Sequence, residues 1–296
     1  MPKDSKLQVY EIGDDEIGKR ADFVVAREIP ELSRSYIKRL AHDGKLTFEG
    51  REVQAGYKLK RPGKLILDYD PAVLQNIPEI ELDIIYEDDD VLAINKPAGL
   101  ITHSRGRYWD EPSVASSIRK KLTRSGSDIR AGIVHRLDRA TSGVIICAKT
   151  ADAQGFLQKQ FEKRTVQKEY IAICNNVELK ATSGLIDMPI GRNPKRPSTF
   201  RVDAKGKSAQ TNYQVLSTSD KYMMLRLSPR TGRTHQLRVH MEKLNAPIVG
   251  DTLYGGKEHD RLMLHAHKLK LEHPNGSELV LEAPLPPEFQ ELLHDN

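Results

Sequence analysis

The sequence predicts an α+β protein in two parts, a small module near the N-terminus and a larger domain after it. Three observations support this fold class. Two short helix-like patterns and several short strand-like runs occupy about residues 15–70. A proline-containing stretch without a sustained hydrophobic period follows, which places the boundary near residue 75. From about residue 80 to residue 290, apolar strand-like runs are interspersed with helix-like ones.

The composition is that of a soluble globular protein. A chain of 296 residues has room for one or two domains. Charged residues make up 29% and aromatic residues 6%, and no apolar run approaches the roughly 18 residues of a membrane span. The first six residues lack the apolar segment of a secretory signal, so we expect a cytoplasmic protein. Cys147 and Cys174 lie in apolar runs, where buried reduced thiols are expected rather than a disulfide.

The formal net charge of +5 makes a polyanionic partner plausible, although many basic proteins bind no nucleic acid. We expect a monomer with no membrane partner. A glycine-rich phosphate loop and a dinucleotide fingerprint are both missing from the sequence, so no nucleotide cofactor is expected. His265 and His267 could share one face of a strand, but no cysteine or carboxylate cluster accompanies them, and we expect no metal site.

The N-terminal module begins, in this prediction, after a loose polar leader of about 14 residues. A helix is expected over 21–27, and Ser33 is placed to cap a second helix over 34–42. Glycine turns then lead into strands at 45–48 and 64–67. The second helix has an apolar face and a cationic face. The apolar residues are Ile37, Leu40 and Ala41, and the cationic ones are Arg34, Lys38 and Arg39.

The segment SRSYIKRL at 33–40, followed by GKL at 44–46 and a turn at Gly50, resembles the alpha-L RNA-binding motif of a small-subunit ribosomal protein and of tyrosyl-tRNA synthetases. A charged helix face is otherwise simply solvated. Glu49 differs from the Asn that such modules often have. The resemblance implies that four cations face RNA phosphates, namely Arg34, Lys38, Arg39 and Lys45.

The larger domain is predicted to open with a hairpin of strands at 82–86 and 91–96. Later elements follow from hydrophobic periodicity and turn residues. They are helices at 113–122 and 152–162, a strand at 168–173, a basic loop at 184–197, strands at 211–216 and 222–227, and a helix from a Thr234 cap to Leu244.

The stretch GIVHRLDRATSG at 132–143 places Asp138 between Arg136 and Arg139. Apolar runs on both sides predict a tight loop or strand end held by a buried sheet. An arginine within about 4 to 6 Å typically lowers an aspartate pKa of about 3.9 by roughly 1 to 3 units. We therefore expect an ionised carboxylate, suited to a nucleophile or charge stabiliser rather than a general acid. An ordinary surface ion pair is the alternative.

Arg238 is predicted near the N-terminus of the helix that ends at Leu244. A cation there opposes the helix dipole unless an anion lies nearby. Asp138 is a candidate partner, because a bidentate arginine fixes the orientation of a carboxylate. Tyr170 lies in a strand close to two opposite charges, where a tyrosine of the core with a hydrogen-bonded hydroxyl is the simpler interpretation.

Taken together, HRLD and TSG at 135–143, KEYIA at 168–172 and GRTHQLRVH at 232–240 are similar to the motifs of the RluA-like family of pseudouridine synthases, in the family's order. The resemblance covers about residues 80–290, and an alpha-L module in front is a known companion. It implies a mixed, mostly antiparallel central sheet with flanking helices. The catalytic domain would then be 80–290 and the RNA-binding module 15–70.

The resemblance also implies the site. Asp138 would be the nucleophile, Tyr170 would contact the base, and Arg238 would pair with Asp138. Arg136 would enter the helical stack when the uridine is flipped out, a step that is needed because a carboxylate cannot reach a stacked base. The implied reaction isomerises uridine in RNA to pseudouridine without cofactor or metal. Whether the carboxylate attacks the sugar or the ring stays open.

Ribosomal RNA of the large subunit is the expected substrate, because of the N-terminal module. Transfer RNA is the alternative substrate. A different alternative is a non-catalytic RNA-binding factor of ribosome assembly with the same fold. A third alternative is an aspartate-dependent RNA or nucleoside glycosidase. Such an enzyme needs a second carboxylate as general acid, and none is evident near 132–143.

Overall fold

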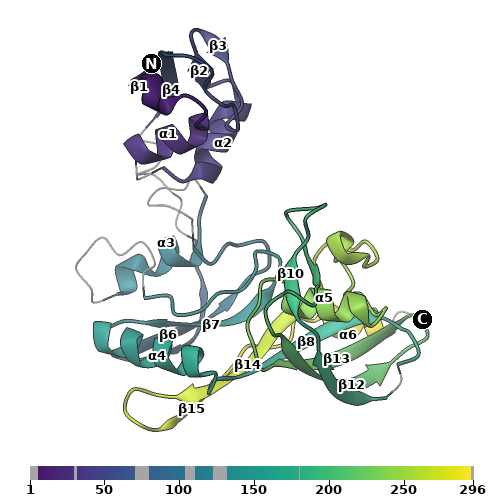
Figure 1. Cartoon of the computed structure of the whole chain (residues 1–296). Coiled ribbons are helices and arrows are strands. Elements are labelled where there is room, and N and C mark those ends of the chain that lie inside the picture. The colour runs from purple at the N-terminus through teal and green to yellow at the C-terminus, as the bar shows by residue number, and fades with distance from the viewer. Residues whose placement is uncertain are drawn as a thin grey trace. The chain divides into compact units, whose positions relative to one another are not determined.

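The computed structural model describes residues 6–29, 32–70, 80–103, 111–122, 132–179 and 181–294. Within these ranges the chain forms two compact units (Figure 1). The first unit extends to residue 81 and also takes in 103–119, and the second contains 82–102 and everything from 132 onward. The predicted boundary near residue 75 and the loop at 124–130 lie outside the described residues.

The first unit is a four-stranded antiparallel sheet with two helices packed on one face, in the strand order β1-β4-β2-β3. The second helix confirms its prediction, because the hydroxyl oxygen of Ser33 accepts a hydrogen bond from the Tyr36 amide at 3.1 Å. Its apolar residues Ile37, Leu40 and Ala41 are buried. The elements are β1 Lys6–Ile12, η1 Asp14–Glu16, α1 Ala21–Glu28, α2 Arg34–His42, β2 Leu46–Phe48, β3 Arg51–Glu52, β4 Gly63–Tyr69 and α3 Val114–Ile118, and η3 Arg119–Lys121 begins in this unit and continues into the second.

Strand β1 corrects the prediction of a loose leader. It pairs with β4 along its whole length, from Lys6 opposite Tyr69 to Ile12 opposite Gly63. Apolar and polar residues alternate here with the period of a strand, but the apolar ones are largely on the outer face. Leu7 and Val9 are 65% and 52% exposed, and Ile12 is buried. Backbone pairing, more than burial of side chains, holds this strand.

The second unit is organised around a nine-stranded sheet in the order β5-β6-β7-β14-β8-β13-β12-β9, with β15 paired to β14. Every pairing is antiparallel except that of β7 with β14, which confirms a mixed, mostly antiparallel sheet. The strands are β5 Asp83–Glu87, β6 Val91–Lys96, β7 Ser142–Ala148, β8 Gln167–Asn175, β9 Ser183–Asp187, β12 Gln210–Thr218, β13 Tyr222–Pro229, β14 Leu264–Glu272 and β15 Glu278–Glu282.

Helices flank this sheet, as predicted (Figure 1). Leu157 of α4 packs with the core of β6 and β7, and Phe289 of α6 packs with that of β8 and β13. The Thr150 hydroxyl oxygen accepts from the Ala153 amide at 3.2 Å, which caps α4. The remaining elements are α4 Ala151–Lys163, α5 Gln236–Lys243, η4 Thr252–Tyr254, α6 Glu288–His294 and the small hairpin of β10 Ile190–Arg192 with β11 Phe200–Val202.

Two local predictions in this unit are wrong. The expected basic loop at 184–197 contains most of β9 and all of β10, so only its second half is a turn. Thr234 does not cap α5. His235 precedes the helix in the left-handed conformation, with φ of 56°, and the Gln236 side chain accepts from the Arg233 amide at 3.0 Å instead.

Both cysteines are buried and unpaired, which confirms their prediction. No helix in the described ranges has the length and apolar character needed to cross a membrane.

Candidate active site

The predicted motif at 132–143 forms a loop that folds back onto β7. The carbonyl oxygen of Gly132 accepts from the Ala148 amide at 2.9 Å, and Ile133 bridges Cys147. Glycines stand at both ends of the loop, and Gly132 and Gly143 have φ of +67° and +112°. A Cβ at Gly143 would lie 2.2 Å from the Ala266 carbonyl oxygen, so only glycine lets β14 approach this closely.

His135 fastens the loop to β7. Its Nε2 accepts a hydrogen bond from the Ile146 amide at 3.0 Å, and its ring stacks on Phe161 with centroids 4.6 Å apart. Burial, together with the charge of Lys168, lowers the pKa of His135 to about 3. The imidazole is therefore neutral, as an acceptor nitrogen requires, and the first residue of the HRLD motif positions the loop.

The segment after β6 holds the other side of the loop. The Thr102 hydroxyl donates to the Leu137 carbonyl oxygen at 2.9 Å, and the Gly99 amide donates to that of Arg139 at 2.8 Å. The ammonium of Lys96 donates to three carbonyl oxygens, those of Pro97 at 2.9 Å, Leu100 at 2.8 Å and Arg139 at 3.2 Å. Lys96 is fully buried at the base of the loop.

The electrostatic environment of Lys96 includes Asp138. Burial lowers the pKa of Lys96 to about 7, the negative charge of Asp138 opposes this shift, and the nearby charges of Arg261 and Arg139 add to it. A buried ammonium thus lies close to the carboxylate that the sequence singles out. The prediction from the sequence did not include Lys96 in the site.

Asp138 keeps its side chain 27% exposed at the tip of the loop. Its Oδ2 lies 3.9 Å from Nε2 of His235, and its backbone carbonyl accepts from the Thr141 amide at 3.1 Å. Arg136 and Arg139 are exposed. The site therefore presents an accessible carboxylate on a rigid loop, with an exposed arginine two residues before it.

The predicted ion pair between Arg238 and Asp138 is wrong. The guanidinium of Arg238 binds Asp251 in a bidentate manner, with Nε–Oδ2 of 2.7 Å and Nη2–Oδ1 of 2.6 Å. The Asp251 side chain is fully buried, and Tyr254 lies beneath the guanidinium at 4.9 Å. Burial alone would lower the pKa of Arg238, but Asp251 and then Asp138 raise it. Asp138 thus acts on Arg238 through space, without an ion pair.

Asp251 was missed because its position depends on tertiary structure. It follows Gly250, which has φ of +79°, and precedes the short η4 turn. Nothing in the local sequence shows that this turn lies against α5. A search of the whole second domain for a carboxylate to pair with Arg238 could have found Asp251, because a buried arginine needs a buried carboxylate.

Tyr170 lies partly buried on β8, where it pairs with Leu227 on one side and Ala266 on the other. Burial raises the pKa of Tyr170, and the charge of Asp138 adds to the shift. The phenol therefore stays protonated and lies within electrostatic reach of Asp138. Its side chain also packs against the core of this unit, but its hydroxyl has no hydrogen bond within the described residues, so the simpler interpretation of a hydrogen-bonded core tyrosine is met only in its packing.

His235 completes the surroundings of Asp138. Its Nδ1 lies 2.7 Å from the Tyr254 hydroxyl, which accepts from the Phe200 amide at 2.9 Å. Burial lowers the pKa of His235, whereas Asp138 raises it. The left-handed backbone of this residue aims the ring at the loop. His235 lies inside a recognised motif, but its contact with Asp138 was not predicted.

His265 and His267 have structural roles. Nδ1 of His265 lies 2.8 Å from the Ser142 hydroxyl, which also accepts from Arg261 at 2.5 Å. Nδ1 of His267 lies 2.9 Å from the Ala283 carbonyl oxygen, to which it donates. Burial lowers the pKa of His265 to about 4. Within the described ranges, no group of three or more histidine, cysteine, aspartate or glutamate side chains is placed to hold a metal ion.

The predicted RNA-binding cations of the first unit differ in whether they hold a buried carboxylate. Arg34 is held by the buried Asp22 at 2.8 Å, and Arg20 shares the same carboxylate. Burial alone would raise the pKa of Asp22, but these two arginines lower it. Lys38, Arg39 and Lys45 are exposed.

Comparison with known proteins defines the class to which this fold and site belong. A family profile described as RNA pseudouridylate synthase matches residues 90–243, a range that contains Lys96, the Asp138 loop, Tyr170 and all of α5. The chain belongs to this family and is an RNA pseudouridine synthase.

The relatives include enzymes of one particular type. The chain is 35% identical to "Ribosomal large subunit pseudouridine synthase D" of Vibrio vulnificus over 95% of this chain and 92% of that one. The protein of the same name from Pseudomonas aeruginosa is 35% identical over 96% and 92%.

Solved structures give the same fold. Human RNA Pseudouridylate Synthase Domain Containing 1 aligns with a TM-score of 0.60 at 29% identity, over 71% of this chain and 86% of that one. Human RNA Pseudouridylate Synthase Domain Containing 4 aligns with a TM-score of 0.58 at 29% identity, over 72% and 92%.

Proposed function

We propose that this pseudouridine synthase modifies ribosomal RNA of the large subunit and that it does so in the cytoplasm. The names and the near full-length similarity of its relatives support this substrate. The division of labour that we propose is an RNA-binding module at 15–70 and a catalytic domain at 80–290. Transfer RNA is the competing substrate, and the test below includes it.

We propose Asp138 as the nucleophile. The supporting observation is the contrast between two carboxylates of the site. Asp138 is 27% exposed, and within the described residues its nearest basic side-chain nitrogen is Nε2 of His235 at 3.9 Å, whereas Asp251 has no exposed side-chain surface and is held by Nε and Nη2 of Arg238. Asp138 can therefore reach a substrate atom, and Asp251 serves to hold Arg238.

The neighbours of Asp138 fit supporting roles. The cationic Arg238, joined by Lys96 when its buried amine is protonated, provides a positive field around the loop, in a site that partly excludes water. Tyr170, kept as a protonated phenol by burial, is proposed to contact the uracil. Arg136 is exposed two residues before Asp138, and we propose that it fills the gap in the RNA stack when the uridine is flipped out.

The reaction keeps all atoms of the nucleoside. The bond between ring nitrogen one and the sugar breaks, the uracil rotates, and a bond forms between ring carbon five and the sugar. Carbon five loses a proton and nitrogen one regains one, so no oxidant or co-substrate is consumed. The protein's part is to flip the base, hold it beside Asp138 and shield it from solvent.

The test is to incubate the protein with unmodified transcripts of large-subunit ribosomal RNA and of transfer RNA, and to assay nuclease digests for pseudouridine. We expect product from the ribosomal transcript and at least a 1000-fold lower rate for Asp138→Asn, on the order of the loss when a nucleophile is removed. The matched control is Asp220→Asn, an exposed aspartate in the turn after β12, which should retain the wild-type rate.

Two results would contradict the proposal. Product from transfer RNA alone would overturn the substrate, and an active Asp138→Asn variant would overturn the nucleophile.

A further inference from the structure

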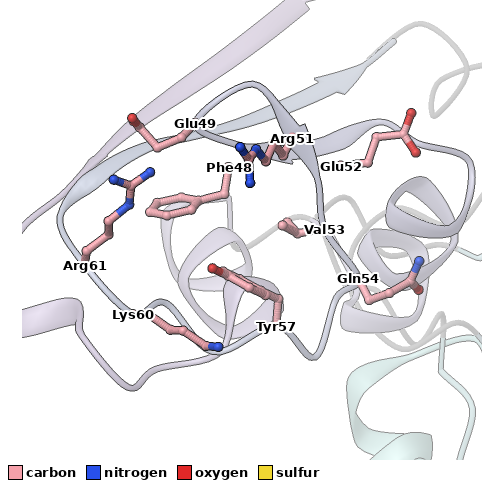
Figure 2. Close-up of a pocket in the computed structure, with 9 residues that line it drawn as sticks. All are labelled: Phe48, Glu49, Arg51, Glu52, Val53, Gln54, Tyr57, Lys60 and Arg61. Atoms are coloured by element: carbon pink, nitrogen blue, oxygen red, sulfur yellow. The ribbon is translucent and has the colours of Figure 1, made fainter.

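A surface hollow lies in the first unit, beside β2, β3 and the chain that continues to Arg61 (Figure 2). Its volume is about 590 Å³, within the range of about 300 to 1,000 Å³ that is usual for small-ligand sites. None of the residues to which the sequence assigns a role lines it. The hollow therefore needs an explanation of its own.

Two aromatic rings form its inner surface. Phe48 is only 4% exposed, whereas Tyr57 is partly exposed, and their ring centroids are 5.9 Å apart at an interplanar angle of 40°. The Tyr57 hydroxyl makes no hydrogen bond with any residue in the described ranges. Tyr57 thus offers a partly open aromatic face, supported from within by Phe48 (Figure 2).

Three cations surround these rings, namely Arg51, Lys60 and Arg61. All three are exposed, and none donates a side-chain hydrogen bond or forms an ion pair within the described part of the chain. Other arginines of this unit differ, because Arg20 and Arg34 bind the buried Asp22. The charges around the hollow are therefore not used to hold the fold.

The two carboxylates at the rim are directed elsewhere. Oε1 of Glu49 accepts from the Lys64 amide at 2.6 Å, and the carboxylate of Glu52 lies beside Gly44. Figure 2 shows both carboxylates pointing away from the aromatic pair. The part of the hollow around Tyr57 is consequently aromatic and cationic.

We propose that this hollow binds one unpaired nucleotide of the RNA substrate. The base stacks on Tyr57, and the adjoining phosphates lie against Arg51 and Arg61. Aromatic faces next to arginines are the usual means by which proteins hold single-stranded RNA, whereas a base within a duplex has no free face to offer. The proposal rests on RNA being the substrate, and it concerns residues separate from the cationic face of α2.

The test uses the full-length protein, a fluorescein-labelled single-stranded RNA and a fully paired RNA hairpin, titrated at several salt concentrations. Tyr57→Leu should weaken single-strand binding at least about 5-fold and leave its salt dependence unchanged, because it removes stacking without removing charge. Tyr57→Phe keeps the ring and should bind like the wild type. Arg51→Gln should make the slope of log affinity against log salt shallower by about 0.7.

The control is Lys58→Gln, an exposed cation beside the lining segment that does not line the hollow. If Tyr57→Leu binds single-stranded RNA with wild-type affinity, or loses as much affinity for the hairpin as for the single strand, the proposed nucleotide pocket is contradicted. RNA as the substrate is not affected by that result. Absence of RNA binding by the wild type would overturn the substrate and the pocket together. Thermal melts establish that each variant is folded. Arg51→Gln tests the same proposal at an exposed side chain.

Discussion

Lys96 is a single residue that links the stability of the protein to the geometry of its active site. Its ammonium is fully buried and donates to a carbonyl oxygen of the Asp138 loop. Burial lowers its pKa from 10.5 to about 7. In the unfolded chain the group keeps its ordinary pKa, so above pH 7 the unfolded state binds more protons than the folded state. The contribution of Lys96 to the free energy of unfolding therefore rises with pH between about 7 and 10.5.

This sign gives a measurable prediction. Between pH 7 and pH 8.5 the free energy of unfolding of the wild type should rise by about 1.5 kcal/mol more than that of Lys96→Met. The comparison stops below pH 9. Burial raises the pKa of Cys147 and of Cys174, so above pH 9 these two thiols lower the free energy of unfolding as the pH rises. Urea denaturation at the two pH values measures the difference. Parallel changes in the two proteins would mean that Lys96 does not titrate in this range.

The Arg238 ion pair shows what residue types alone could not establish. The need of Arg238 for a nearby anion was correctly predicted from its place near the start of a helix. The identity of the carboxylate was not, because Asp251 lies 13 residues further along the chain, beyond the end of α5, and is brought close by the packing of η4 against α5. The sequence thus predicted that Arg238 needs an anion, but not which residue supplies it.

At the scale of elements, the Asp138 loop depends on the glycines that delimit it. A side chain at Gly143 would meet the Ala266 carbonyl oxygen of β14 at 2.2 Å, in a backbone conformation with φ of +112°. We predict that Gly143→Ala lowers the free energy of unfolding by about 2 to 4 kcal/mol and also reduces activity.

The control is Gly155→Ala in the middle of α4, where no atom lies within 4 Å of the added Cβ. This change should raise the free energy of unfolding by about 0.5 to 1 kcal/mol, because alanine favours a helix more than glycine does. Urea denaturation measures both variants. Equal effects of the two substitutions would show that the contact between β7 and β14 does not constrain Gly143.

Elements with local signals were predicted well. The second helix of the first unit, with its Ser33 cap, begins and ends where the sequence indicates. Strand β1 was missed, because Leu7 and Val9 stand between Lys6, Gln8 and Tyr10 and face outward, so no apolar core pattern marks the strand. The start of α5 was predicted wrongly, with Thr234 as its cap. His235 instead has a left-handed backbone, and the Gln236 side chain accepts a hydrogen bond from the Arg233 amide. The local sequence does not indicate this arrangement.

At the scale of the whole molecule, the net charge of +5 suits a polyanionic substrate. We propose that part of this charge acts through α2 and the turn after it. Arg34 is a poor target for testing this proposal, because it also holds the buried Asp22, and its loss would change stability as well as binding. Lys38 and Lys45 are exposed and have no ion pair within the described residues, so they are the better targets.

The double variant Lys38→Ala, Lys45→Ala should bind ribosomal RNA more weakly, with a salt slope shallower by about 1.4 to 1.8. Filter binding at four salt concentrations measures the slope. The double variant Lys159→Ala, Lys163→Ala removes the same charge from α4 and should leave the slope close to that of the wild type. Equal slopes for the two double variants would show that total charge, rather than the α2 face, sets the salt dependence.

The position of β14 has a consequence for how the protein acquires its active site. This strand lies between β7 and β8, and it is the strand that joins β5-β6-β7 to β8-β13-β12-β9 (Figure 1). Strands β5, β6 and β7 pair with one another, as do β8, β13, β12 and β9, and residues 264–266 of β14 pair with both groups. Contacts of such long sequence separation form slowly. The loop of Asp138 and the strand of Tyr170 are thus brought into register by a strand that is synthesised after both of them.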